Sequence, residues 1–486
     1  MFSENRSETI NSWKGEWIYA LVIDRFHDGR ERTLYDNHTR TGFGNAADLR
    51  ETCGGTLNGI RKKIPYIKEL GCTSILLTPF LENNSEHYHG YAIQDFLRVD
   101  ARFGTLEELK ALVQEAHDVD MRVIMDVVLN HTGNNWSYIE ERTPYRKRKP
   151  YTFSHWHHED KPQPLALRNE AWYSKRGQIV HWDKYPESWD GDIFELKDLV
   201  WDDTVIGWEV LECMVGVYSY WIKETGVDGF RLDALKHIRP VMANAFCNRI
   251  KAEAKHFGKE HFILIGEVVG NMELISQYTE LHAFFNFPFY FNFLQGIKKK
   301  NLYETFGTYS QDYFLPVNYL DNHDQIGLEP KKRISDLLTD EQLLGSLFLM
   351  GLEEGINCLY YGTEQGLRTL GVQDHDVREC LFDPYGEMEL FDESHTGYQK
   401  LRTVIGLVTL IKKSSDRIER LELEPGLHVI ECKFKDQLVY KIFFNSSYKN
   451  NAALLTLQDE VVFSTHDAML SSTLKPMELR VYQVRL

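Results

Sequence analysis

Four short stretches of the sequence place acidic residues directly after apolar runs. They read DVVLNH (126–131), GFRLDALKH (229–237), LIGEVV (264–269) and YLDNHD (319–324). A single aspartate at the end of a strand is usually a turn or helix-capping residue. Four acids accompanied by histidines and an arginine exceed what capping needs. Carboxylates brought close together raise one another's pKa, and a carboxyl that keeps its proton at neutral pH can donate it.

Arg231 and Asp233 alternate within one of these runs, VDGFRLD (227–233). Residues two apart in a strand face the same side, so the two side chains point to the same place. A guanidinium beside a carboxylate keeps it ionised and oriented. The pair therefore predicts a strand whose end serves chemistry rather than packing.

The elements that carry these acids repeat along the chain. β-like runs alternate with helical patterns such as 57–71 and 105–118, which show helical spacing of apolar residues. Eight alternations predict a (β/α)8 barrel, an α/β fold whose catalytic residues lie at the carboxyl ends of the strands. We expect the strands at 17–23, 73–80, 122–128, 227–233, 262–268, 283–287, 316–322 and 356–362.

Two segments interrupt the alternation. Residues 134–197 are rich in Trp, His and Tyr, and a loop of this length is usually functional or a small domain. From about residue 414, apolar and polar residues alternate as in antiparallel strands. We therefore expect a barrel built from 1–133 and 198–413, a subdomain inserted after the third strand at 134–197, and a C-terminal antiparallel β domain at 414–486.

Composition excludes some classes of partner. The formal net charge of −17 argues against nucleic acid, because a phosphate backbone needs a basic surface. The apolar run at 404–411 is too short to span a bilayer. Seven scattered cysteines without a CxxC pair fit a reducing compartment. With no signal-peptide pattern at the N-terminus, we expect a cytoplasmic protein; the oligomeric state is not predicted.

Taken in order, the four acidic stretches resemble the motifs of the α-amylase family of retaining glycoside hydrolases. The resemblance extends to GTLNGI (55–60), YHGYAIQDF (88–96) and YYGTEQG (360–366), and covers roughly residues 15–400. It implies the same (β/α)8 barrel, with an inserted domain after strand three and a C-terminal β domain. It also implies cleavage of a glycosidic bond by double displacement.

The resemblance implies roles for three carboxyls. Asp233 is the expected nucleophile, Glu267 the general acid and base, and Asp324 a third carboxylate that binds sugar hydroxyls and stabilises the transition state. The chemistry agrees, since a retaining enzyme needs a nucleophile and an acid/base with carboxyls ~5–5.5 Å apart.

Further residues resemble the family's sugar-binding positions. Tyr91 matches an aromatic platform, although a core tyrosine is the alternative interpretation, and Asp374 and Arg378 match a further pair less closely. Lys236 and His237 follow the pattern of α-1,4-acting members. The full set of expected substrate-binding residues is Tyr91, His89, His131, Arg231, Lys236, His237, His323, Asp374 and Arg378.

The family often holds a calcium ion between the barrel and the inserted domain. Here Asn130, Asp198 and the backbone carbonyl of His237 match its ligands, and oxygen ligands suit Ca²⁺. Lys197 departs from the pattern, because proline is common at that position. The stretch DRFHDG (24–29) is a second candidate calcium loop, with a plain turn as the alternative.

The sequence thus predicts a hydrolase of α-1,4-glucosidic bonds in starch-type glucans or maltooligosaccharides. A transglycosylase of the same family remains open, since the motifs do not separate the two. A non-catalytic glucan-binding relative is disfavoured because all three carboxyls are present. We further expect at least one tryptophan of the insert to line the substrate cleft, from the set Trp136, Trp156, Trp172, Trp182 and Trp189.

Overall fold

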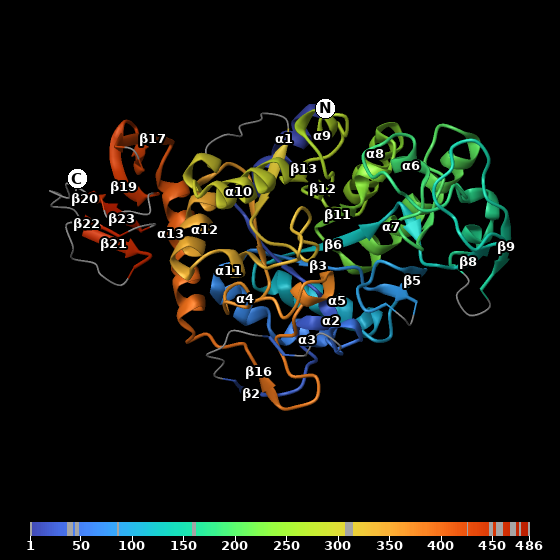
Figure 1. The fold of residues 1–486 in the computed structure, drawn as a ribbon, viewed down its shortest axis with the longest axis horizontal. Coiled ribbons are helices and arrows are strands. Elements are labelled where there is room, and N and C mark those ends of the chain that lie inside the picture. Colours follow the sequence, from blue (N-terminus) through green and yellow to red (C-terminus); the bar gives the residue numbers. More distant parts are fainter. Residues whose placement is uncertain are drawn as a thin grey trace.

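The fold is a central barrel with an irregular insert on one side and a β-sheet on the other (Figure 1). The structure is a computed structural model. It describes residues 2–35, 42–43, 48–84, 87–157, 162–306, 314–424, 426–446, 451–452, 460–466, 473–475 and 478–484.

Eight parallel strands close the barrel, which confirms the predicted fold. Each coincides with one of the predicted runs, and their side chains are buried almost throughout, as near-continuous apolar sequence requires. In chain order they are β1 (Trp17–Leu21), β3 (Ser74–Leu77), β6 (Arg122–Val128), β11 (Gly229–Asp233), β12 (Ile263–Gly266), β13 (Ala283–Phe285), β14 (Leu315–Tyr319) and β15 (Ile356–Tyr360).

Helices separate the strands along the chain. The helix predicted at 105–118 is observed at Leu106–Asp118, and Thr105 and Glu108 form a reciprocal cap at its start. The predicted helix 57–71 is divided in two near Pro65, which cannot donate a backbone hydrogen bond. The longer helices are α1 (Phe2–Trp13), α3 (Leu57–Lys62), α4 (Ile64–Leu70), α5 (Leu106–Asp118), α7 (Val205–Thr225), α8 (Pro240–His256), α10 (Phe287–Lys299), α12 (Asp340–Leu352) and α13 (Thr396–Ser414).

Single-turn elements occur mainly in the loops. The short α-helices are α2 (Ile23–Phe26), α6 (Glu187–Asp190), α9 (Met272–Ile275) and α11 (Ile334–Leu337). The 3-10 turns are η1 (Asp48–Arg50), η2 (Leu165–Arg168), η3 (Glu170–Trp172), η4 (Leu235–His237), η5 (Tyr303–Thr305) and η6 (Asp374–Val377).

Short strand pairs organise the insert and two other loops. β7 (His131–Thr132) pairs with β10 (Lys197–Asp198), so the end of the insert returns beside its beginning. Within the insert, β8 (Trp136–Tyr138) pairs with β9 (Phe153–Trp156). Elsewhere β4 (Leu81–Asn83) pairs with β5 (Ile93–Val99), and β2 (Thr33–Leu34) with β16 (Met388–Glu389).

The C-terminal part forms the expected antiparallel sheet. Its strands lie in the order β17 (Arg417–Glu424), β18 (Leu427–Phe434), β19 (Gln437–Asn445), β23 (Leu479–Gln483) and β21 (Glu460–Ser464), beside a separate pair of β20 (Asn451–Ala452) and β22 (Thr473–Leu474). The Phe348 ring of α12 stacks on Phe463 with centroids 6.1 Å apart, which ties the sheet to the barrel. The exact domain boundaries at 133/134, 197/198 and 413/414 stay predictions.

None of the helices in the described part of the chain combines the length and the apolar character needed to span a bilayer.

Close packing along β11 generates a first prediction. A Cβ on Gly229 would overlap the Ile263 side chain and lie 2.8 Å from its carbonyl oxygen. Gly229→Ala should lower the free energy of unfolding by about 1–3 kcal/mol, as overpacking does. Gly216→Ala, on α7 with open space around its Cβ, is the control and should raise it by about 0.5–1 kcal/mol. Denaturant unfolding of both variants checks this, and equal stability of Gly229→Ala and wild type would contradict it.

Candidate active site

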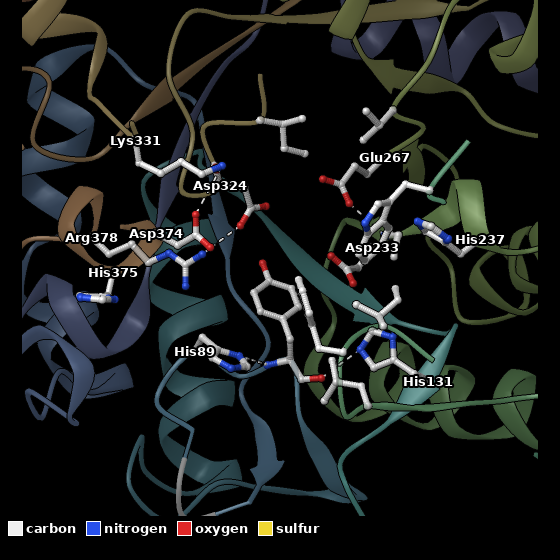
Figure 2. Close-up of a pocket in the computed structure, with 18 of the residues that line it drawn as sticks. His89, His131, Asp233, His237, Glu267, Asp324, Lys331, Asp374, His375 and Arg378 are labelled. Carbon is white, nitrogen blue, oxygen red and sulfur yellow. Dashed lines mark hydrogen bonds and ion pairs between the residues drawn. The ribbon is translucent and has the colours of Figure 1, made fainter. Parts of the chain in front are cut away.

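The carboxyl ends of the barrel strands open into a cavity of about 850 Å³. All three predicted catalytic carboxyls line it. Figure 2 shows Asp324 and Arg378 on one side of the cavity and Asp233 and Glu267 on the other. The remaining lining residues come from the barrel loops and from the insert, so the cavity brings together segments that are distant in the sequence.

One guanidinium connects the acids at the floor of the cavity. Arg231 Nη1 lies 2.5 Å from Asp233 Oδ1 and 2.8 Å from the carboxylate of Asp126, and its Nη2 lies 2.8 Å from Glu267 Oε1. The strand register explains the arrangement, because Arg231 pairs directly with Asp126 across β11 and β6. The side chain is 4% exposed, so these ion pairs are shielded from water.

Burial shifts the protonation of this cluster. It raises the pKa of Asp233 to about 7, with Asp126 and Asp324 adding to the rise and Arg231 opposing it. It likewise raises the pKa of Glu267 to about 7 and that of Asp126 to about 6. The two reactive carboxyls therefore titrate as a pair, in which the charge of one favours the proton on the other.

Asp324 has the opposite character. Burial acts to raise its pKa, but His323, Arg378 and Arg231 outweigh it and hold the pKa of Asp324 far below its usual range. His323 Nε2 lies 3.1 Å from Asp324 Oδ2, and Arg378 Nη2 donates to Oδ1 at 3.0 Å. Asp324 is thus a permanent carboxylate, suited to accept hydrogen bonds from hydroxyl groups and to stabilise positive charge.

Tyr91 anchors the predicted aromatic group. Its ring stacks on His323 with centroids 5.7 Å apart, and its hydroxyl donates to Asp126 Oδ2 at 2.8 Å. His89 Nδ1 accepts the Tyr91 backbone N–H at 3.0 Å, and His131 Nε2 lies 3.2 Å from the Tyr91 carbonyl oxygen. Burial lowers the pKa of His131 to about 4 and that of His89 well below its usual range, so both imidazoles are neutral at pH 7.

Lys236 and His237 connect the barrel to the insert. Lys236 Nζ lies 2.5 Å from the Asp183 carboxylate. His237 Nδ1 lies 2.6 Å from the Ser188 carbonyl oxygen, and burial lowers the pKa of His237 to about 4. Through these contacts the barrel holds the insert against the rim of the cavity.

The insert supplies Trp182 to the cavity, which confirms that one of its tryptophans lines the cleft. Trp182 is 37% exposed and packs between Phe194 and His237, with ring centroids 5.6 and 5.7 Å away. By contrast Trp136 and Trp172 are buried in the core.

Several lining residues were not predicted from the sequence. Lys331 bonds the Asp374 carboxylate at 3.4 Å and reaches the Asp324 carbonyl at 3.0 Å. It follows the fourth acidic motif in a stretch without periodicity, so no sequence signal marks it. Tyr88 also lines the cavity. It belongs to the stretch YHGYAIQDF (88–96), so that motif could have marked it as a site residue. The other unpredicted lining residues are Arg50, Ile193, Phe194, Ala234, Leu196, Val269, Ile326, Gly327, Glu329 and His375.

The expected calcium ligands lie where the insert meets the barrel. Asn130 and Asp198 are buried, and their side-chain polar atoms have no hydrogen-bond partner within the described chain. Leu199 N–H donates to the Asn130 carbonyl at 2.9 Å, which keeps the two residues adjacent. Lys197 Nζ lies 5.0 Å from the ring centres of Trp136 and Tyr138. Buried oxygens without partners fit a bound cation.

The second calcium candidate, 24–29, is accounted for differently. Asp24 lies 2.9 Å from Arg25 Nε, and its carboxylate accepts the Cys53 and Gly54 backbone N–H groups. Asp28 is paired with Arg30 and Arg32. Both carboxylates already have cationic or amide partners, which favours the alternative of a structural turn.

Comparison with known proteins shows which family this architecture belongs to. The family model described as "Alpha amylase, catalytic domain" matches residues 18–382. An α-amylase of Saccharomycopsis fibuligera is 28% identical over 399 residues, covering 78% of this chain and 71% of that protein. A cyclomaltodextrin glucanotransferase of Klebsiella oxytoca is 32% identical over 276 residues, which are 54% of this chain and 39% of that protein. The match thus spans well under half of the Klebsiella enzyme.

Solved structures give the same result over nearly the whole chain. The α-amylase of Geobacillus thermoleovorans, solved with acarbose, has a TM-score of 0.70 at 26% identity and covers 98% of this chain and 99% of its own. The fold also matches CldA, a cyclomaltodextrin glucanotransferase, with a TM-score of 0.67 at 23% identity.

A (β/α)8 barrel with a cluster of carboxyls at its carboxyl-terminal face defines the general class as a barrel enzyme. Because the family model covers most of the sequence, the chain belongs to the α-amylase family. The family predicted from the four acidic motifs is therefore confirmed, and the relatives matched include α-amylases and a cyclomaltodextrin glucanotransferase.

The exposed ring of Trp182 yields a second prediction. If it stacks on a sugar, Trp182→Ala should raise KM for a maltooligosaccharide by about twofold to tenfold, equivalent to ~0.5–1.5 kcal/mol of ring stacking. Trp208, 40% exposed on α7, gives the matched control, because it does not line the cavity. Steady-state kinetics and product chain lengths check the prediction, and identical values for Trp182→Ala and Trp208→Ala would contradict it.

Proposed function

We propose that this chain is a retaining α-glycoside hydrolase that cleaves α-1,4-glucosidic bonds in starch-type glucans or maltooligosaccharides. One observation carries the proposal. Asp233 and Glu267 face one cavity while sharing the Arg231 guanidinium, so a nucleophile and a proton donor could both reach a glycosidic bond bound there.

In the first step, Glu267 donates its proton to the departing glycosidic oxygen while Asp233 attacks the anomeric carbon. The bond to the leaving sugar breaks and a covalent bond to Asp233 forms, with inversion at that carbon. The raised pKa of Glu267 keeps the required proton available at neutral pH.

In the second step, the Glu267 carboxylate removes a proton from water as the water attacks the same carbon. The bond to Asp233 breaks, and the second inversion restores the α configuration. Asp324 remains charged throughout and stabilises the positive charge that develops on the sugar ring. Tyr91 and His89 line the same cavity, so their rings are available to stack on a sugar face or to bind its hydroxyl groups.

Transglycosylation is a second candidate. Trp182, Phe194, Ile193 and Leu196 form an apolar part of the lining on the side of Lys236. A sugar acceptor bound on such a surface would compete with water for attack on the covalent intermediate. The matched relatives include a glucanotransferase as well as amylases, and products from maltoheptaose separate the two outcomes.

We also propose a structural calcium ion held by Asn130, Asp198 and the His237 carbonyl. When bound, it would neutralise the buried Asp198 and join the insert to the barrel. Burial raises the pKa of Asp198 well above its usual range, so a cation beside this carboxylate would stabilise its charged form. The ion takes no part in the proton transfers.

A third prediction tests the nucleophile. Asp233→Asn should reduce kcat on maltoheptaose by roughly three orders of magnitude or more, because the amide cannot form the covalent intermediate. Circular dichroism and glucan binding should remain near wild type. Residual kcat above a tenth of wild type would remove Asp233 from this role.

A fourth prediction concerns pH. Since Glu267 must carry a proton, kcat/KM should fall as pH rises past about 7, the pKa to which burial raises this group. Glu267→Gln should remove that alkaline limb and lose far less activity on an aryl glycoside with a good leaving group than on maltoheptaose. An unchanged alkaline limb in the variant would show that another group is the acid.

A fifth prediction tests the metal. Calcium should raise the melting temperature, because it binds only the folded chain, and a chelator should lower it. Asp198→Asn should abolish this response, whereas Asp203→Asn, an exposed aspartate nearby, should retain it. A wild-type melting temperature that changes with neither calcium nor chelator would refute the site.

A further inference from the structure

Two cysteines share one buried arginine beneath the cavity. Arg25 of α2 is fully buried, and its Nη1 donates to Cys53 Sγ at 3.0 Å and lies 4.0 Å from Cys380 Sγ. The two sulfur atoms therefore lie beside the same nitrogen atom of Arg25, and the nearby Cys53 thiol adds to the effect of burial in raising the pKa of Cys380. Both cysteines are free thiols in the structure.

Backbone contacts hold the two sulfur atoms in this position. Cys53 N–H donates to the Asp24 carboxylate at 2.9 Å, and Arg25 Nη2 donates to the carbonyls of Leu49 and Glu51, also at 2.9 Å. On the other side, Cys380 exchanges backbone hydrogen bonds with Phe43. The Arg25 carbonyl also accepts the Leu381 N–H at 3.0 Å, so Arg25 holds the segments that carry Cys53 and Cys380 beside each other.

We propose that Cys53 and Cys380 form a site of oxidative modification, at which a low-molecular-weight disulfide such as oxidised glutathione converts the two thiols into one internal disulfide. Thiols that exchange readily lie next to a cation and within reach of solvent. Cys53 meets both conditions, since it contacts Arg25 and is half-buried.

The exchange proceeds in two steps. The Cys53 thiolate attacks one sulfur of the glutathione disulfide, forming a mixed disulfide and releasing one glutathione thiolate. The Cys380 thiolate then attacks the Cys53 sulfur, forming the internal bond and releasing the second glutathione. The protein thiols lose two electrons to the glutathione disulfide, and their protons pass to water or to the released thiolates. Burial raises the pKa of Cys380, so its thiol must lose a proton before this second attack.

Other thiols of the chain do not meet these conditions. Cys72 and Cys358 interact electrostatically with each other, but both are buried inside the barrel, out of reach of an oxidant. Cys213 on α7 is half-buried, yet no other cysteine of the described chain is shown in contact with it. It is therefore the matched control for exposure alone.

The modification would act on the cavity through a short chain of contacts. The Arg25 guanidinium stacks on the Tyr88 ring at 3.8 Å, and Tyr88 OH accepts from Arg378 at 3.2 Å. Arg378 in turn bonds Asp324. A disulfide would take the thiol acceptors from Arg25 and draw together the segments that carry Arg50 and Arg378. Substrate binding should weaken, an expectation that rests on the proposed function.

The bond itself is tested without any activity. The full chain is incubated with oxidised glutathione, and its peptides are analysed by mass spectrometry without reduction. We expect a linked peptide pair joining Cys53 to Cys380, formed by the wild type and Cys213→Ser but not by Cys53→Ser or Cys380→Ala. A stable mixed disulfide on Cys53 alone, or no modification, would overturn the proposal.

Kinetics test the coupling to the cavity. Oxidation of the wild type should raise KM for maltoheptaose about fivefold or more, a typical coupling between two sites, with kcat little changed and full recovery after dithiothreitol. Cys53→Ser should show no response. A linked pair with unchanged KM would overturn the coupling. Absence of glucan cleavage in reduced protein would instead refute the proposed function and leave the disulfide result standing.

Discussion

The active site depends on the ion pairs of one buried guanidinium. Arg231 contacts Asp126, Asp233 and Glu267, and three carboxyls could not be enclosed so closely without a cation, because each buried unpaired charge costs several kcal/mol. Its charge is not sufficient to ionise all of them, so the pKa of Asp233 and of Glu267 stays near 7. Because Arg231 neutralises the carboxyl cluster only in part, one proton stays on the cluster near neutral pH and is available for catalysis.

Asp324 shows how position within one cavity sets chemical role. It has two further cationic or hydrogen-bonding neighbours, His323 and Arg378, and its pKa is lowered where those of its neighbours are raised. Asymmetric pairing therefore separates a permanent carboxylate from a proton donor, although all three acids lie at strand ends of the same barrel. The loops after β14 and β15 supply this asymmetry, and the insert closes the opposite side through Lys236 and His237.

Sequence alone predicted the parts of the site that local patterns encode. The eight strands follow from apolar runs, and the acids follow from their places at the strand ends. The pairing of Arg231 with Asp126 depends on strand register, and Lys331 and Phe194 reach the cavity from loops without periodicity. The sequence predicted a tryptophan in the cleft but not which of the five candidates it would be. Their positions are fixed by contacts between distant segments, which a single sequence does not express. The expected calcium ligands also depend on contacts between distant segments. Asn130 and Asp198 become neighbours only through the pairing of β7 with β10.

The pH profile of kcat/KM for Arg231→Lys tests the central claim most directly. Lysine keeps the charge but cannot bridge Asp233 and Glu267 as the planar guanidinium does. Because Arg231 lowers the pKa of both carboxyls, its replacement should move the acidic and alkaline limbs of the profile to higher pH. Reduced activity with both limbs at their wild-type positions would show that the guanidinium does not set the protonation of the pair, and would contradict the account.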